Sequence, residues 1–277
     1  MFDNIFAAIE KWMRELLTGM VESNMSTMFT DVNEKTSEIA AQVGRTPQNW
    51  NSSVFSMIQN LSESVVVPIA GIIITLVLCY ELISMLTERN NLHDVDTWMF
   101  FKYFVKAWVA IYLVSNTFTI TMAVFDVGQS VVNSASGIIN GETAIDVSSL
   151  SMQMQAAMAT MEIGELVVLA LETFLVSFCM KIMSVVITVI VYGRMIEIYL
   201  YTSLAPIPFA TMSNREWGHV GTNYFRGLFA LAFQAFLMMV CVAIYAALIS
   251  SVRISSNMHS ALIGVAAYTV ILCFSLM

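Results

Sequence analysis

Ionisable side chains inside otherwise apolar segments are the residues whose placement points most directly to chemistry. They are Glu81, Glu172, Lys181, Arg194 and Glu197. Burying such a group in a lipid bilayer is costly unless it is paired or in contact with water. Two interpretations therefore stand side by side: a polar lining for a conduit, and structural pairing between helices.

Spacing along a helix sorts these residues into pairs. Arg194 and Glu197 are three positions apart, which predicts a local pair on one helix face. Glu172 and Lys181 are nine positions apart and fall on opposite faces, so they do not pair with each other. Lys181 lies near the middle of its segment, and Glu81 is a candidate partner for it because a long lysine side chain can reach toward a distant carboxylate.

Two amides add to the polar residues in apolar segments. Gln234 and Asn116 can each form hydrogen bonds between helices, which contribute about 0.6–2 kcal/mol in membranes. Gln234 is the one that joins the candidate conduit or structural residues.

The sequence carries no signature of an enzyme. It has no phosphate-binding glycine loop, zinc-protease motif or serine elbow. The run His93-Asp94-Val95-Asp96 fits a solvated turn better than a metal site because it lacks a second set of ligands. The four cysteines lie inside apolar runs and form no CxxC pair. We therefore expect no catalytic residue, no cofactor and no metal.

Composition indicates a polytopic integral membrane protein of the all-α class. The chain is 58% hydrophobic and 12% charged, whereas soluble domains are about 25% charged. Its net charge of −8 argues against a nucleic-acid-binding surface. About five transmembrane helices are expected, over residues 65–86, 100–125, 166–201, 226–250 and 261–277.

Two prolines break the longest apolar run, residues 166–212. At about 1.5 Å per residue a continuous helix would reach about 70 Å, too long for one crossing of the bilayer. Pro206 and Pro208 remove backbone donors and disfavour helix in the residue before each. We expect a long third helix, then a non-helical or re-entrant hinge over 204–212. A full crossing there would make six spans, the alternative topology.

Charge distribution predicts the orientation. Residues 126–165 contain no Lys or Arg, which is typical of an external loop. With that loop outside, only Arg253 remains in the short external loops, and the inner ends collect the other span-flanking cations: Arg89, Lys102, Lys106, Arg194, Arg215 and Arg226. This places the N-terminus outside and the C-terminus in the cytoplasm.

The first 64 residues form a predicted extracytoplasmic region before the transmembrane domain of 65–277. Apolar residues recur at i, i+3 and i+4 from Phe2 to Met20, which predicts an amphipathic helix. That helix either lies on the lipid surface or packs on protein. Residues 23–64 are rich in Ser, Asn and Thr, and we expect short helices and linkers there. Within the external loop, 148–161 predicts a short Met-rich helix.

Residues 192–248 resemble the core of TrbL-type conjugal transfer proteins. The likeness rests on the order of Arg194-x-x-Glu197, Ala205-Pro206-Ile207-Pro208, Glu216-Trp217-Gly218 and the span containing Gln234. The runs 65–82 and 125–139 are similar to the branch of the family found on Gram-positive conjugative elements.

The resemblance implies a multi-pass subunit of the cell membrane that belongs to a type IV secretion system. It implies a homo-oligomer that assembles with other membrane subunits and with ATPases, and that contacts a transferred DNA–protein substrate transiently. A secondary transporter or small-solute channel is the alternative, although it predicts inverted repeats that the sequence lacks. A structural scaffold without a conduit remains a third interpretation.

Overall fold

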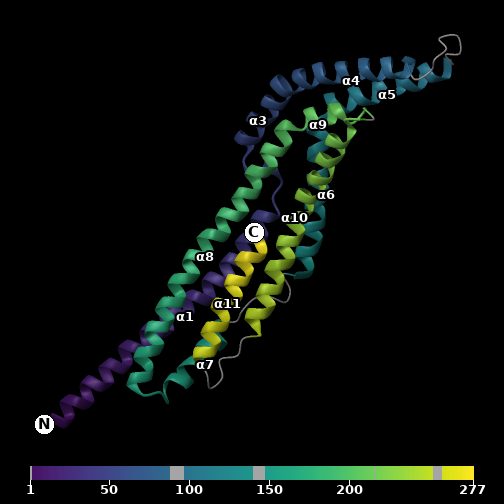
Figure 1. Cartoon of the computed structure of the whole chain (residues 1–277). Coiled ribbons are helices and arrows are strands. Elements are labelled where there is room, and N and C mark those ends of the chain that lie inside the picture. Colours follow the sequence, from purple (N-terminus) through teal and green to yellow (C-terminus); the bar gives the residue numbers. More distant parts are fainter. Residues whose placement is uncertain (1, 88–96, 140–146, 215, 252–257) are drawn as a thin grey trace. The chain divides into compact units, whose positions relative to one another are not determined.

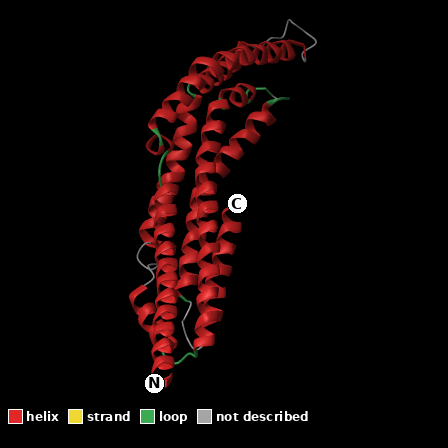
Figure 2. Cartoon of the chain, turned by 90° about the vertical axis from the view of Figure 1, so that its left-hand side faces the viewer, coloured by secondary structure: helices red, strands yellow, loops and turns green. Residues whose placement is uncertain are grey.

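The computed structural model describes residues 2–87, 97–139, 147–214, 216–251 and 258–277, and these are helical apart from short turns (Figure 2). This confirms the all-α class. The elements shown in Figure 1 are α1 (Phe2–Val43), α2 (Pro47–Trp50), α3 (Ser52–Leu61), the π-helical turn η1 (Ser62–Val66), α4 (Val67–Thr87), α5 (Thr97–Ser115), α6 (Thr117–Ile139), α7 (Val147–Met158), α8 (Ile163–Leu204), α9 (Pro206–Thr211), α10 (Gly218–Ser250) and α11 (Met258–Leu276).

Five helical segments of the described residues are long and apolar enough to cross a membrane, as predicted. They are Ser52–Thr87, Thr97–Ser115, Ile163–Leu204, Gly218–Ser251 and Met258–Leu276. The alternative topology requires a sixth span, and the described residues contain no sixth candidate.

The predicted second span, 100–125, is wrong at its end, because the helix is interrupted at Asn116. Asn116 Nδ2 donates to the carbonyl of Tyr112 at 2.9 Å, and Thr117 Oγ1 donates to the carbonyl of Leu113 at 2.8 Å. Such side-chain bonds compete with the regular helix ladder and separate α5 from α6. The bond expected from Asn116 to another helix is thus made within its own turn.

The chain forms two compact units. Unit 1 contains residues 1–44, 132–192 and 237–277, and unit 2 contains residues 45–131 and 193–236. Helices α6, α8 and α10 contribute residues to both units.

In unit 1, α1 is one helix of 42 residues. The expectation of short helices and linkers from residue 23 onward is therefore wrong for 23–43. An apolar face accounts for the continuous helix, and its buried members are Val21, Met25, Met28, Phe29, Val32, Ile39 and Val43. The same expectation is confirmed after that point, where α2 and α3 are short. Thr46 Oγ1 and Asn51 Oδ1 cap their first turns.

The first half of α1 keeps its predicted apolar stripe. Ile5, Phe6, Ile9, Trp12 and Leu16 are all exposed, so no described part of the chain covers them. This stripe is therefore available to lipid or to another protein.

Residues of the predicted external loop also fold back onto unit 1. The short helix expected over 148–161 is confirmed as α7, and its Met154 and Met158 are buried. Glu22 of α1 accepts hydrogen bonds from Ser151 at 3.0 Å and Gln155 at 2.8 Å. Burial favours plain packing as the role of Met154 and Met158, whereas Met152 is exposed.

Candidate functional site

The proline break in unit 2 is a short helix and not an irregular segment. Helix α8 ends at Leu204, and Pro206 occupies the first turn of α9, where its missing N–H leaves no donor unsatisfied. Phe209 N donates to the carbonyl of Ala205 at 3.2 Å, and Thr211 Oγ1 donates to the carbonyl of Pro208 at 2.7 Å. The predicted interruption is thus confirmed, while the expectation of non-helical backbone there is wrong.

Close contacts hold this break in place. A Cβ on Gly221 of α10 would lie 2.1 Å from Met212 Cγ and 2.5 Å from the carbonyl oxygen of Pro208. Only glycine therefore allows α10 to approach α9 so closely. The rings of Tyr201 and Tyr224 stack with centroids 4.6 Å apart, and Tyr224 donates its hydroxyl to the carbonyl of Tyr201 at 2.8 Å.

Arg194 is buried in unit 2 with 7% of its surface exposed. Its Nη2 donates to the carbonyl of Leu231 at 3.5 Å, and its Nε has no hydrogen-bond partner among the described residues. Glu197 lies on the exposed face, and the two form no salt bridge. The predicted local pair is therefore wrong, because the arginine turns toward α10 and the glutamate turns outward.

Gln234 lies one turn along α10 from Leu231. Its Oε1 is buried without a hydrogen-bond partner in the described part of the chain. Together with Nε of Arg194, it is one of several buried polar atoms of unit 2 without a hydrogen-bond partner among the described residues, and the others belong to Ser62, Ser213 and Asn214. Buried polar atoms are normally bonded to protein or to ordered water.

Three other charged side chains of unit 2 have partners. Lys106 of α5 contacts Glu81 of α4 at 2.5 Å, so the pairing expected between Glu81 and Lys181 is wrong. Tyr80 donates to Glu216 at 3.0 Å and stacks on Trp217. The Glu-Trp-Gly motif thus anchors the start of α10 to α4.

In unit 1, Glu172 of α8 contacts His259 Nδ1 of α11, and each side chain is 37% exposed. Sequence analysis identified Glu172 but missed its partner, which lies 87 residues away. Lys181 is exposed on α8 and forms no salt bridge with any described residue.

Helix α1 supplies polar contacts to α8 that sequence analysis also missed. Asn24 Nδ2 donates to Thr173 at 3.4 Å, and Lys35 Nζ donates to Thr188 at 3.3 Å and also contacts Glu38. The helical spacing of the apolar residues from Val21 to Val43 is the signal in the sequence that indicates this packing.

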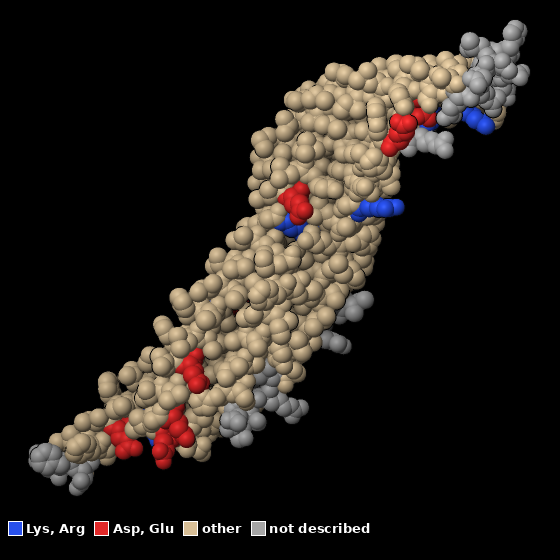
Figure 3. Space-filling model, viewed as in Figure 1, with Lys and Arg blue, Asp and Glu red and all other residues tan. Residues whose placement is uncertain are grey.

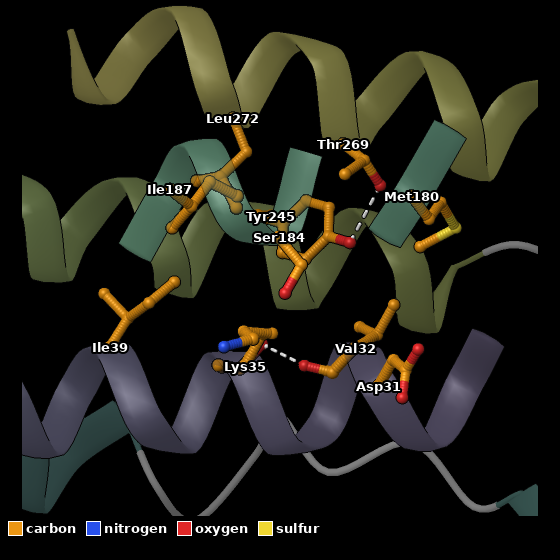
Figure 4. A pocket seen from close by; sticks show the side chains of 11 residues that line it. Asp31, Val32, Lys35, Ile39, Met180, Ser184, Ile187, Tyr245, Thr269 and Leu272 are labelled. Atoms are coloured by element: carbon orange, nitrogen blue, oxygen red, sulfur yellow. Dashed lines mark hydrogen bonds between the residues drawn. The ribbon is translucent and has the colours of Figure 1, made fainter. Parts of the chain in front are cut away.

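A small cavity lies between α1, α8, α10 and α11 (Figure 4). Asp31 and Lys35 line it from α1. On another wall, the hydroxyl groups of Tyr245 and Thr269 form a hydrogen bond with their oxygens 3.0 Å apart. The volume that the centre of a water molecule can occupy in this cavity is about 20 Å³. The cavity therefore has room for one ordered water. It is too small to hold a substrate.

Among the described residues no three His, Cys, Asp or Glu side chains come together as metal ligands. The run His93-Asp94-Val95-Asp96 lies outside the described residues. On the face drawn in Figure 3, charged side chains form a few separate groups with broad uncharged surface between them, as expected of a protein in contact with lipid.

Comparison with known proteins identifies the family. The model of the family described as TrbL/VirB6 plasmid conjugal transfer-like protein matches residues 32–206, which begin in the second half of α1 and end at Pro206. No curated protein and no solved structure matches the chain. The match extends over more than half of the sequence and agrees with the five apolar spans. This multi-pass membrane protein belongs to the TrbL/VirB6 plasmid conjugal transfer-like family.

Proposed function

We propose that this chain is a channel or scaffold subunit of a conjugative type IV secretion system. It helps a DNA–protein substrate to cross the cytoplasmic membrane and catalyses no reaction itself. Partner ATPases supply the energy, and other membrane subunits and further copies of this chain complete the assembly. The N-terminus lies outside and the C-terminus in the cytoplasm.

The observation that carries this proposal is the family match over residues 32–206 on a chain with five candidate spans. The polar groups within those spans support it further. Lys181 and Glu197 are exposed and form no salt bridge with any described residue, and such groups in a membrane mark contact with water or with another protein.

Mating efficiency tests the proposal. The gene is deleted from the conjugative element and supplied in trans, and transfer to a recipient is counted. We expect transfer to be lost and then restored by the wild-type chain. The Gly193→Ala variant should restore it equally, because a Cβ at that position meets no atom within 4 Å.

Unchanged transfer in the deletion strain would contradict the proposal. Flux of ions or small solutes through reconstituted vesicles would then test the transporter alternative. Loss of transfer that the wild-type chain fails to restore would point to a polar effect on neighbouring genes, and would also count against the proposal.

A further inference from the structure

Helix α1 lies beside the most apolar part of α8. The contacts Asn24–Thr173 and Lys35–Thr188 place the two helices parallel and side by side (Figure 1). Between Phe174 and Val191, α8 carries only one charge, Lys181. Those residues span about 27 Å, close to the thickness of a hydrocarbon core at about 30 Å. The second half of α1, although it is not one of the five candidate spans, therefore reaches the depth of the bilayer beside α8, which differs from the extracytoplasmic position expected for residues 1–64.

The outward face of this half of α1 is polar. Its exposed positions recur every three or four residues, so they lie along one face of the helix. We call this face the α1 polar stripe, and its members are Ser23, Thr27, Thr30, Glu34 and Ser37. The buried face opposite contains Met25, Met28 and Val32.

Lipid is an unsuitable neighbour for this stripe. Between Val21 and Val43, all of them described residues, no large apolar side chain is exposed. Charged side chains at membrane depth face either the interior of a helix bundle or water, yet Glu34 is exposed on unit 1. Two charged side chains of α1 also lie toward unit 1, because Asp31 and Lys35 line the cavity shown in Figure 4.

The charge around the stripe separates the two remaining neighbours, protein and water. Between residues 22 and 38 the only cation is Lys35, which is already engaged with Glu38 and Thr188. Of the acidic residues there, Glu22 is bonded to Ser151 and Gln155, Asp31 lines the inner cavity and Glu38 contacts Lys35. Glu34 is the charged member of the stripe, and direct contact between two copies of this face would bring their Glu34 carboxylates together with no cation on either stripe, which is unfavourable. A hydrated space between copies avoids that repulsion.

We infer that the α1 polar stripe borders a water-filled lumen at membrane depth, closed by further copies of this chain. This inference rests on the proposed function, because it assigns the wall of the conduit. The wall is acidic, since Glu34 is the charged member of the stripe and no cation lies on it. An acidic wall attracts cations and basic protein segments, and it repels the phosphate backbone of a nucleic acid. A transferred strand would therefore be kept away from the wall.

Reactivity of single cysteines toward a charged, water-soluble methanethiosulfonate tests the inference. The full chain is expressed in membranes with Cys79, Cys179, Cys241 and Cys273 replaced by serine, and its elution as a folded species in mild detergent is verified. Thr30→Cys probes the stripe, and Val32→Cys is the buried control. Val185→Cys on α8 and Ile271→Cys on α11 probe apolar positions that are 64% and 57% exposed.

We expect the Thr30→Cys variant to react at least an order of magnitude faster than the three others. Equal reactivity at Thr30, Val185 and Ile271 would place this part of the chain in bulk water and overturn the inference. Protection at Thr30 would show that the stripe is covered by lipid or by a dry protein contact, and would also overturn it.

A second comparison tests the acidic character of the wall. The Thr30→Cys variant should react preferentially with a cationic reagent over an anionic one, relative to the same ratio for a free thiol in solution. Adding Glu34→Gln, one turn away on the stripe, should reduce that preference. An unchanged ratio would contradict an acidic wall.

The matched control for this comparison is Glu10→Gln, which removes an exposed carboxylate from the first half of α1. It lies about 30 Å along the helix from Thr30, well beyond the screening length of about 8–10 Å, so the preference should stay the same. A reduction equal to that of Glu34→Gln would overturn the local assignment. Because these rates need no mating, a failed deletion experiment and a failed labelling experiment are distinguishable.

Discussion

The two units accommodate their polar side chains differently. In unit 2, Lys106 pairs with Glu81, Tyr80 with Glu216, and Arg194 is buried against α10. In unit 1 a whole helix face, the α1 polar stripe, stays exposed beside an apolar span, and Lys181 is exposed on that span.

This difference teaches that polar residues within apolar segments are not one class. Pairing or burial of these unit 2 groups fits a structural role, since Lys106, Glu81 and Glu216 each contact a partner and Arg194 is buried by the chain itself. The exposed face of unit 1 has no such shielding, so it requires water or another protein. Only part of the sequence-predicted list is therefore a candidate for conduit lining. That part is Lys181 and Glu197, and the α1 polar stripe adds candidates that the sequence did not predict.

The largest effect is expected from the proline break of unit 2. In the Pro206→Ala, Pro208→Ala double variant, α8 gains the missing backbone donors and loses the ring clashes, so it can continue past Leu204. A continuous helix would displace α9 from its contacts with Gly221. We expect mating to fall by at least an order of magnitude with normal insertion. Normal transfer in this variant would remove the break from the mechanism.

A single methyl group tests how tightly unit 2 is packed. Gly221→Ala should lower the free energy of unfolding by about 1–3 kcal/mol because its Cβ would overlap Met212 and the carbonyl of Pro208. Gly193→Ala, with open space around its Cβ, should be neutral or slightly stabilising. Thermal unfolding in detergent measures both effects. Equal transition temperatures for the two variants would show that α10 has room for a Cβ at position 221, and would contradict the close approach of α10 to α9.

The tyrosine pair gives a smaller effect in the same region. Tyr224→Phe removes the hydroxyl that donates to the carbonyl of Tyr201 but keeps the stacked ring. A loss of about 0.5–1.5 kcal/mol is expected. Tyr112→Phe, at an exposed position on α5 where the ring stacks on Trp108, is the comparison variant. A similar loss from that substitution would mean that the buried hydroxyl has no special role.

Arg194 separates stability from function within unit 2. Its replacement by methionine keeps a long side chain and removes a buried cation that has no salt bridge among the described residues. Unfolding should then be unchanged or require more free energy, and transfer should stay close to the wild-type level because the chain shields this side chain from cargo and water. Loss of transfer with unchanged stability would show that Arg194 has a role in transfer beyond packing.

The smallest effect is expected for the pair of Lys106 and Glu81. Their side chains are 42% and 23% exposed, and partly exposed pairs couple by about 0.2–1 kcal/mol. A double-mutant cycle with Lys106→Met and Glu81→Gln measures this coupling. A value of several kcal/mol would show that the pair is shielded from solvent in the assembled protein.

Hydropathy made most of the fold predictable. The five spans follow from apolar length, and the break follows from Pro206 and Pro208, because both features are local in sequence. Helix α1 was missed beyond residue 22 because its composition is polar, although Met25, Met28 and Val32 repeat at helical spacing.

The candidate site was less predictable for a different physical reason. Glu172 and His259, Glu81 and Lys106, and Arg194 and Leu231 are partners brought together by packing between helices. Spacing along one helix gives no information about such partners. Nor does it show which face of α1 is covered, since that depends on α8, α10 and α11.

Mating frequency of a stripe variant, divided by the amount of chain in the membrane, tests the contrast between the units most directly. Thr27→Leu, Thr30→Leu and Ser37→Leu together make three of the five positions of the α1 polar stripe apolar without touching its buried face. If the stripe borders a lumen, transfer should fall by at least an order of magnitude while the amount of protein stays the same. Wild-type transfer from this variant would contradict the account.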